Sequence, residues 1–325
     1  LSPAGAAGAL SVLPNSRATK ITMSASPASP APFGGAGNAV SALLQTVYGN
    51  IPTGNVVFKE GASVLGTSAI NASGSASLST TALTQGVHKI VAEYAGDTGS
   101  FPAKSAEFNY EVRGSTTTAL TSTANPSVSG QSVDLIAKVN VTGGATGTPT
   151  GSVKFTDNGV DLQTVAVDGT GSAKLTTTAL TVGTHPIVAT YLGATGFATS
   201  TSSTLNQIVN KADTMITLTS SANPSAKGTA VTFTATPTVK APGGGSVVGT
   251  VTFNDGVSSL GTATITGGVS TISVASLTVG THNITAVYTG TSALNGTTSE
   301  ILVQTVALNA ATVMLTSSKN TSSLG

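Results

Sequence analysis

The chain has 325 residues, no cysteine and a net charge of +1, and only 8% of its residues are charged, against roughly 25% in ordinary globular proteins. The missing cysteines exclude disulfides, iron–sulfur clusters and thiolate zinc sites, and the lack of a Lys/Arg cluster argues against nucleic acid as a partner. No apolar run approaches the ~18–20 residues that a membrane-spanning helix needs. A surface of Thr, Ser and small aliphatic residues favours an extracellular or cell-surface location, because intracellular proteins usually rely on a well-charged surface for solubility.

The chain opens with a short segment, residues 1–17, that precedes three copies of one repeated unit. Its sequence ALSVLPNSRATKI resembles the later junctions FNYEVRGSTTTA and LNQIVNKADTMI. We therefore predict that residues 1–17 are an N-terminal extension or the last strand of a preceding repeat.

Three repeats of about 97 residues follow, and we place them at 18–113, 114–210 and 211–308. Stretches such as SVDLIAKV and VTFTAT alternate apolar and polar residues, which indicates half-buried β-strands. Asp157-Asn-Gly159 and Asn254-Asp-Gly256 lie between alternating runs and predict tight hairpins. No segment has a sustained helical period, so the sequence predicts an all-β chain.

Each repeat carries a phenylalanine, a histidine and a tyrosine at the same positions. A histidine begins the pattern G-x-H-x-I-x-A-x-Y, a tyrosine ends it, and a phenylalanine precedes it in a V-x-F strand. We predict that these residues belong to the structural core of the repeat: His88, His185, His282, Tyr94, Tyr191, Tyr288, Phe58, Phe155 and Phe253.

The final segment, residues 309–325, contains TVMLTSSKNTSSLG, which matches the opening strands TMITLTSSANPSAKG and TTALTSTANPSVSG. We predict that it is the first strand of a truncated fourth repeat. Only two to four residues separate the last strand of one unit from the first strand of the next, without a Pro-rich or Gly/Ser-rich spacer. With strands rising ~3.3 Å per residue, each unit would span roughly 35–40 Å, and the three would form an elongated array on the order of 100 Å long.

Roughly seven short strands per unit, with a turn every 8–12 residues, are typical of an immunoglobulin-like sandwich. The run TPTGSVKFTDNGVDLQTVAV, followed by LTVGTHPIVATYLG, resembles the bacterial Ig-like repeat domains that occur in tandem in large surface and secreted proteins. The resemblance covers residues 18 to 308 as three copies. It implies tandem Ig-like β-sandwich domains, here without the Cys and Trp residues of antibody domains.

The repeated histidine raises the question of a catalytic or metal site. Strand alternation puts His185, Ile187, Ala189 and Tyr191 on one face, with the histidine at its rim, where its ring can bond a loop carbonyl. A metal needs three or four converging ligands, and we expect no second histidine and no recurrent acidic residue beside these positions. We therefore predict a structural histidine, no catalytic or metal-binding residue, and no cofactor.

Other side chains give weaker signals. Asp97 becomes Ala194 and Thr291 in the other copies, which argues against a repeated calcium site. Phe101, Phe197 and Leu294 share a loop position and are predicted to close a sandwich end or touch the neighbouring unit. Five N-x-S/T sequons are candidates for glycosylation, although a Thr/Ser-rich chain produces such motifs by chance: Asn71, Asn140, Asn283, Asn295 and Asn320.

These observations favour a non-enzymatic extracellular structural protein, a stalk, fibre or adhesin shaft whose partners are neighbouring repeats. A filament variant stays open, in which the terminal strands complete the sheet of an identical subunit; arbitrary truncation explains the same segments. The alternative is a binding region, for a glycan or a surface protein, that belongs to a larger secreted enzyme or adhesin.

Overall fold

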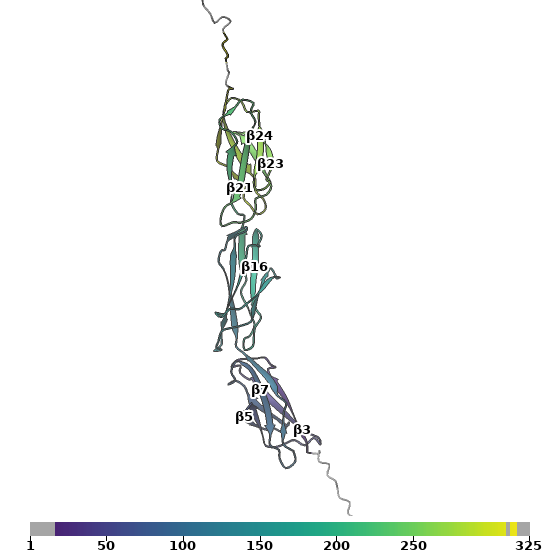
Figure 1. Ribbon diagram of the computed structural model, residues 1–325. Helices are drawn as coiled ribbons and strands as arrows, with labels where there is room; N and C mark the ends of the chain where they lie inside the picture. The colour runs from purple at the N-terminus through teal and green to yellow at the C-terminus, as the bar shows by residue number, and fades with distance from the viewer. Residues whose placement is uncertain (1–16, 310–312, 317–325) are drawn as a thin grey trace, which may run out of the picture. The chain divides into compact units, whose positions relative to one another are not determined.

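The computed structural model describes residues 17–309 and 313–316, and it consists of β-strands joined by turns and loops (Figure 1). Contacts divide the chain into two compact units, and the boundary between them passes through the second repeat. Unit 1 consists of Leu1–Thr121, Leu135–Leu175 and Pro186–Leu205, and unit 2 consists of Ser122–Asp134, Thr176–His185 and Asn206–Gly325. A helix of the length and hydrophobicity needed to span a membrane is not found among the described residues.

Each repeat contributes nine strands to the described part of the chain. Those of the first repeat are β1 (Thr19–Ser26), β2 (Ala31–Pro32), β3 (Ala39–Thr46), β4 (Asn55–Glu60), β5 (Ser63–Ala69), β6 (Ser75–Ser79), β7 (Gly86–Tyr94), β8 (Ala103–Lys104) and β9 (Phe108–Arg113). Those of the second are β10 (Thr116–Ser122), β11 (Ser127–Val128), β12 (Val133–Val141), β13 (Ser152–Asp157), β14 (Val160–Ala166), β15 (Ser172–Thr177), β16 (Gly183–Tyr191), β17 (Ser200–Thr201) and β18 (Leu205–Asn210). Those of the third are β19 (Thr214–Ser220), β20 (Ser225–Ala226), β21 (Val231–Val239), β22 (Thr250–Asp255), β23 (Ser258–Thr264), β24 (Ser270–Val274), β25 (Gly280–Tyr288), β26 (Thr297–Thr298) and β27 (Leu302–Ala307).

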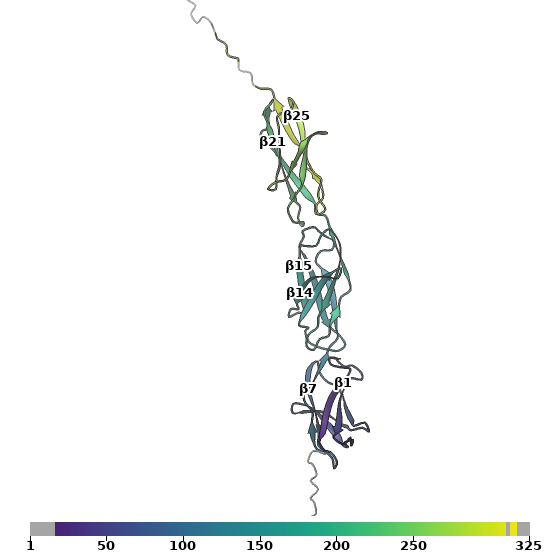
Figure 2. The same cartoon turned by 90° about the vertical axis from the view of Figure 1, so that its right-hand side faces the viewer.

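The strands of every repeat form two sheets with the same order. In the first repeat one sheet has the order β1-β3-β6 and the other the order β2-β9-β7-β4-β5, with β8 paired to β7 (Figure 2, where β1 and β7 mark one strand of each sheet). The second and third repeats follow the same order with their own strands. The opening strand is therefore divided between the sheets: β1 pairs antiparallel with β3, whereas β2 pairs parallel with β9. This is the two-sheet architecture of an Ig-like sandwich.

The core of each repeat lies between its two sheets and follows the predicted alternation. Along β7 the side chains of His88, Ile90, Ala92 and Tyr94 are buried, and the residues between them are not. The same pattern returns in β25. The three phenylalanines of the V-x-F strands are completely buried: Phe58, Phe155 and Phe253. Successive side chains of a strand point to opposite faces. The apolar residues at every second position of each strand therefore all point between the two sheets and fill the core.

The hairpin after each V-x-F strand has a two-residue turn. Asp157 pairs with Val160, so Asn158 and Gly159 form the turn, and both have positive φ angles (47° and 81°), as a type I′ turn requires. In the third repeat the turn is Gly256-Val257, because Asn254 and Asp255 belong to β22 and Asp255 pairs with Ser258. The predicted hairpin at this place is present, with its turn shifted toward the C-terminus.

Candidate functional site

The repeated histidine lies at the beginning of its strand and holds the turn that precedes it. In all three repeats Nε2 of the ring bonds the backbone oxygen of the threonine four residues earlier: His88 to Thr84 at 2.9 Å, His185 to Thr181 at 2.8 Å and His282 to Thr278 at 2.8 Å. The predicted bond between the histidine and a loop carbonyl is thus present in every copy.

The expectation that no recurrent acidic residue accompanies the histidine is wrong. Nδ1 of His88 lies 3.0 Å from Oε2 of Glu60, and Nδ1 of His282 lies 2.6 Å from Oδ2 of Asp255. Asp157 occupies the same place in the second repeat, two residues after the repeated phenylalanine. The signal was readable in the sequence as an acidic residue at that position in all three copies, but it lies on another strand, far from the histidine along the chain.

The surroundings of His282 favour its charged form. Both ring nitrogens face oxygen atoms that can only accept, so only the doubly protonated imidazolium donates to both. The carbonyl of Thr278 and then the carboxylate of Asp255 raise the pKa of His282, against an opposing effect of burial. Among the described residues no three His, Cys, Asp or Glu side chains converge as a metal site requires. The histidine thus joins the preceding turn to the strand that carries its acidic partner. We call this arrangement, His88 with Thr84 and Glu60 or His282 with Thr278 and Asp255, the latch.

The repeated tyrosine ends the same strand and fixes the loop at the other end of the sandwich. Its hydroxyl donates to a loop carbonyl in each copy: Tyr94 to Thr53 at 2.9 Å, Tyr191 to Thr150 at 2.6 Å and Tyr288 to Val248 at 3.0 Å. Burial raises the pKa of Tyr191.

Asp97 joins two loops of the first repeat through its carboxylate. Its Oδ2 accepts from the backbone N–H and the hydroxyl of Thr53 at 2.8 and 2.9 Å, and its Oδ1 accepts from the N–H of Gly99 at 2.8 Å. These bonds, those of Thr53 first, hold the pKa of Asp97 well below its usual range. Burial, together with the neighbouring carboxylate, raises the pKa of Tyr94 to about 12. Asp97 thus ties two loops of the first repeat together.

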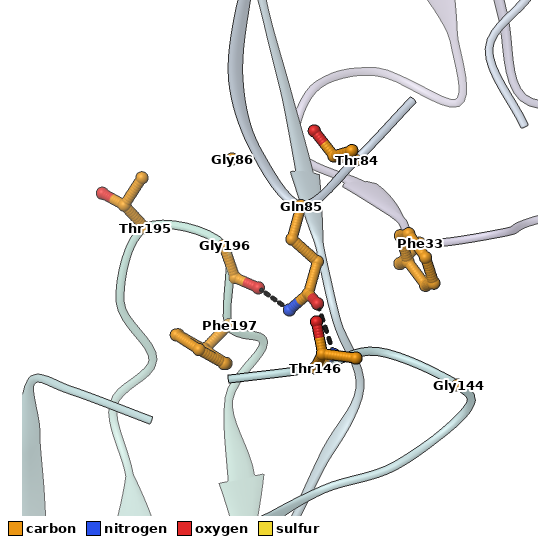
Figure 3. Close-up of a pocket in the computed structure, with 9 residues that line it drawn as sticks. All are labelled: Phe33, Thr84, Gln85, Gly86, Gly144, Thr146, Thr195, Gly196 and Phe197. Atoms are coloured by element: carbon orange, nitrogen blue, oxygen red, sulfur yellow. Dashed lines mark hydrogen bonds between the residues drawn. The ribbon is translucent and has the colours of Figure 1, made fainter. Parts of the chain in front are cut away.

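Unit 1 also brings the turn of the first repeat against two loops of the second, around Gln85 (Figure 3). Nε2 of Gln85 donates to the backbone oxygen of Gly196 at 2.9 Å, and its Oε1 accepts from the N–H of Thr146 at 2.6 Å. Phe197 lies on one side of this carboxamide and Phe33 on the other, and the residues line a hollow of about 380 Å³ (Figure 3). Gln85 follows Thr84 directly, so the His88 latch holds the segment that carries it.

Two further hydrogen bonds hold the backbone of Gly196. The N–H of Gly196 donates to Oε1 of Glu111 at 3.2 Å, and its carbonyl oxygen accepts from the N–H of Gly114 at 2.8 Å. Glu111 is itself paired with Arg113, which donates from Nε and Nη2 at 2.8 and 2.9 Å. The hydrogen bond from Arg113, helped by that from Gly196, lowers the pKa of Glu111. The sequence did not mark Gln85 or Glu111 as functional, since Val182 and Ile208 stand at their places in the second repeat.

Comparison with protein families decides what the repeats are. Residues 23–113, 120–210 and 218–307 each match the bacterial Ig-like domain, group 3. The chain belongs to this family. The Ig-like domain boundaries at 18–113, 114–210 and 211–308 stay predictions. No match was found among curated proteins.

Several solved structures are similar to this tandem of Ig-like repeats. Fibronectin(III)-like modules of CbhA from Clostridium thermocellum share 14% identity, with coverage of 59% of this chain and 94% of theirs and a TM-score of 0.25. FdeC, an Escherichia coli adhesin, shares 18% identity, with coverage of 89% and 96% and a TM-score of 0.28. The ectodomain of mouse nectin-like molecule 4 (Ig1–Ig3) shares 14% identity, with coverage of 87% and 98% and a TM-score of 0.32.

The prediction that Phe101, Phe197 and Leu294 share a loop position is wrong for the first repeat. Ser100 is the residue equivalent to Phe197 and Leu294, because its carbonyl oxygen accepts from the N–H three residues earlier as theirs do, and Phe101 lies one residue further along the loop. Phe101 is 44% exposed, Phe197 lines the hollow beside Gln85, and Leu294 is buried with Ala212 and Tyr288. The backbone of the loop is nevertheless anchored in the same way, because the residue at 101, 198 or 295 donates its N–H to the segment that precedes the first strand. Leu294 closes a sandwich end, and Phe197 contacts the region where two repeats meet.

Four of the predicted sequons lie on exposed asparagines of the Ig-like repeats: Asn71, Asn140, Asn283 and Asn295. Asn295 donates from its side chain to Asp213 at 2.8 Å, and Asn283 lies within β25. Asn320 falls outside the described residues, as do residues 1–16 of the predicted N-terminal strand. Of the predicted fourth-repeat strand, residues 313–316 are described; they have no regular secondary structure and are exposed. Glycosylation stays a prediction.

Proposed function

We propose that this chain is a non-catalytic, structural part of a bacterial cell-surface or secreted protein, in which tandem Ig-like repeats act as a stalk or adhesin shaft. The observation that carries the proposal is the succession of three family-matched repeats with only six or seven residues between the matched ranges. Linkers this short restrict the relative motion of neighbouring domains. The weakly charged, Thr-rich surface supports a location outside the cell.

Small-angle scattering and negative-stain imaging test the shaft. A shaft gives elongated particles whose maximum dimension is on the order of 100 Å and does not change with ionic strength. Compact particles, or a scattering profile of freely jointed domains, would refute the proposal. A control with a Gly/Ser linker of about ten residues inserted after Gly114 should behave as jointed domains, which shows that the measurement can tell the two apart.

A filament is a second proposal, and the exposed apolar segment near the C-terminus supports it. Val313, Met314 and Leu315 are 83%, 85% and 95% exposed, and their sequence matches the opening strands of the repeats. Such a segment has the composition to pair with an open sheet edge of an identical subunit. Sedimentation at increasing concentration tests this: polymers should form with the whole chain and disappear when residues 1–17 or 309–325 are deleted. Polymers that survive both deletions would exclude strand donation. A glycan or protein ligand stays a prediction.

A further inference from the structure

We propose that Gln85 and Glu111 form a clamp by which the first repeat recognises the repeat that follows it, through the backbone of one glycine, Gly196. The partner that fits this clamp is a loop of another Ig-like repeat with glycine at the position of Gly196. The inference deepens the proposed function and rests on one part of it, which is that successive repeats are held in fixed contact.

The clamp engages both polar groups of the glycine. Glu111 accepts from the N–H of Gly196, and Gln85 donates to its carbonyl oxygen. A carboxamide has both a donor and an acceptor, and Gln85 uses its remaining oxygen for the N–H of Thr146 on a second loop. Two side chains of one repeat thereby satisfy three backbone groups of the next.

Glu111 is held in place for this contact. Arg113 binds both of its carboxylate oxygens in the forked geometry that gives Arg–carboxylate pairs their directional strength. The Glu111 side chain is only 16% exposed, so the ionised form of its carboxylate depends on these donors. The position of Glu111 is therefore set inside the first repeat, before the second repeat is met.

Glycine is needed at the recognised position for its backbone and not for its small size. Gly196 is buried and has a φ angle of 80°, which side chains other than that of glycine rarely tolerate. A Cβ atom added there would lie 3.6 Å from the N of Gly86 and 3.7 Å from Cβ of Gln85, which is ordinary contact. At Gly114, in contrast, an added Cβ would lie 2.5 Å from Nε2 of Gln85, so the linker leaves the carboxamide just enough room.

The corresponding positions around the third repeat lack every part of the clamp. Val182 and Ile208 stand where the first repeat has Gln85 and Glu111, and Ala293 stands where the second has Gly196. Valine and isoleucine offer no side-chain hydrogen bond. In unit 2 the contact is made by backbone groups, with the N–H of Gly244 3.2 Å from the oxygen of Ser129. The two junctions thus have different chemistry, and the clamp matches one repeat to a particular successor.

Amide hydrogen exchange of the whole 325-residue chain tests the clamp. Gln85→Val, which installs the residue of the second repeat, should speed exchange of the Thr146 amide by about fivefold, the equivalent of one hydrogen bond of about 1 kcal/mol. Glu111→Ile should do the same for the Gly196 amide. Amides of β13 and β16 should keep their protection, which establishes that the second repeat is folded.

Val182→Ala is the matched control, because it changes the equivalent turn of the second repeat and should leave both amides unchanged. Unchanged exchange at Thr146 in Gln85→Val, or an equal effect of Val182→Ala, would overturn the clamp. The readout is local, so it is independent of the particle shape that tests the shaft. Elongated particles with unaltered exchange would reject the clamp alone, and jointed particles with faster exchange would reject the shaft alone.

Discussion

Replacing Asp255 by asparagine should weaken the pH dependence of the stability of the third repeat. Asp255 accepts from Nδ1 of His282 at 2.6 Å, while the carbonyl of Thr278 takes the other ring nitrogen. His282 is 9% exposed, and these two acceptors raise its pKa above the ordinary value of 6.5. Asparagine can still accept through its side-chain oxygen, but it brings no negative charge, so the charged imidazolium loses part of its stabilisation.

The sign and the upper limit of the effect follow from linkage. Because the pKa of His282 is raised in the folded state, its contribution is complete below pH 6.5 and is lost as the pH rises through the folded pKa. One histidine binds at most one extra proton, so the free energy of unfolding changes by no more than about 1.4 kcal/mol per pH unit in that window. In Asp255→Asn the slope should become shallower, and the stability above the window should change little.

Hydrogen exchange of β25 measured between pH 5 and pH 9, corrected for the intrinsic rate, gives this slope in the whole chain, and NMR titration of the His282 ring gives its pKa directly. Asp213→Asn, in the same repeat but bonded to Asn295, serves as the control and should keep the slope of the unaltered chain. A His282 ring that titrates at 6.5, or equal slopes in Asp255→Asn and the unaltered chain, would contradict the reasoning.

Three further predictions concern the core and the loops. Tyr191→Phe removes the bond to the carbonyl of Thr150, and because Thr150 is exposed, water replaces the donor; denaturant unfolding should report a loss of about 1 kcal/mol. Phe155→Ala empties a completely buried site and should cost about 3–5 kcal/mol, whereas Val257→Ala at a fully exposed turn should stay within about 0.5 kcal/mol. Asp97 has a lowered pKa, so its contribution is present above its ordinary pKa of 3.8 and is lost as the pH falls; acid unfolding followed by circular dichroism should depend less on pH in Asp97→Asn.

The fold could be predicted from the sequence because apolar and polar residues alternate along each long strand. Alternation along VTFTAT and SVDLIAKV predicted the buried faces of β21 and β12, and the structure confirms both. The recurrence of Ile, Ala and Tyr at fixed spacing predicted residues that are buried in β7, β16 and β25, whereas the histidine is buried in β7 and β25 and only half-buried, as His185, in β16. Periodicity succeeds here because burial on one face of a strand is decided by neighbours in sequence.

The parts that could not be predicted depend on residues that are far apart in sequence or occur in one copy only. Gln207 and Gln304 are completely buried, although their polar side chains would place them outside by pattern alone; each donates to a backbone carbonyl, of Ala124 and Ala222 respectively. The first repeat has Tyr110 at the same place, and a glutamine that recurs in only two copies does not by itself indicate burial. The acidic partners of the histidines recur in all three copies, but they lie on another strand, and only the fold brings them beside the histidines. The Gln85 clamp occurs in one copy and joins loops that are far apart in the sequence.

The division of the opening strand between the two sheets has a mechanical consequence for each repeat. Because β2 runs parallel to the last strand β9, with Ala31 opposite Val112, tension that pulls the two ends of the repeat apart acts along both strands and not across them. The hydrogen bonds of the pair, joined by that from Phe33 to the carbonyl of Arg113, then have to break together instead of one after another. The same parallel pair occurs as β11 with β18 and as β20 with β27. Every repeat therefore has a short shear-loaded contact between its opening and last strands, and this contact has to break before the strands between them can be drawn apart.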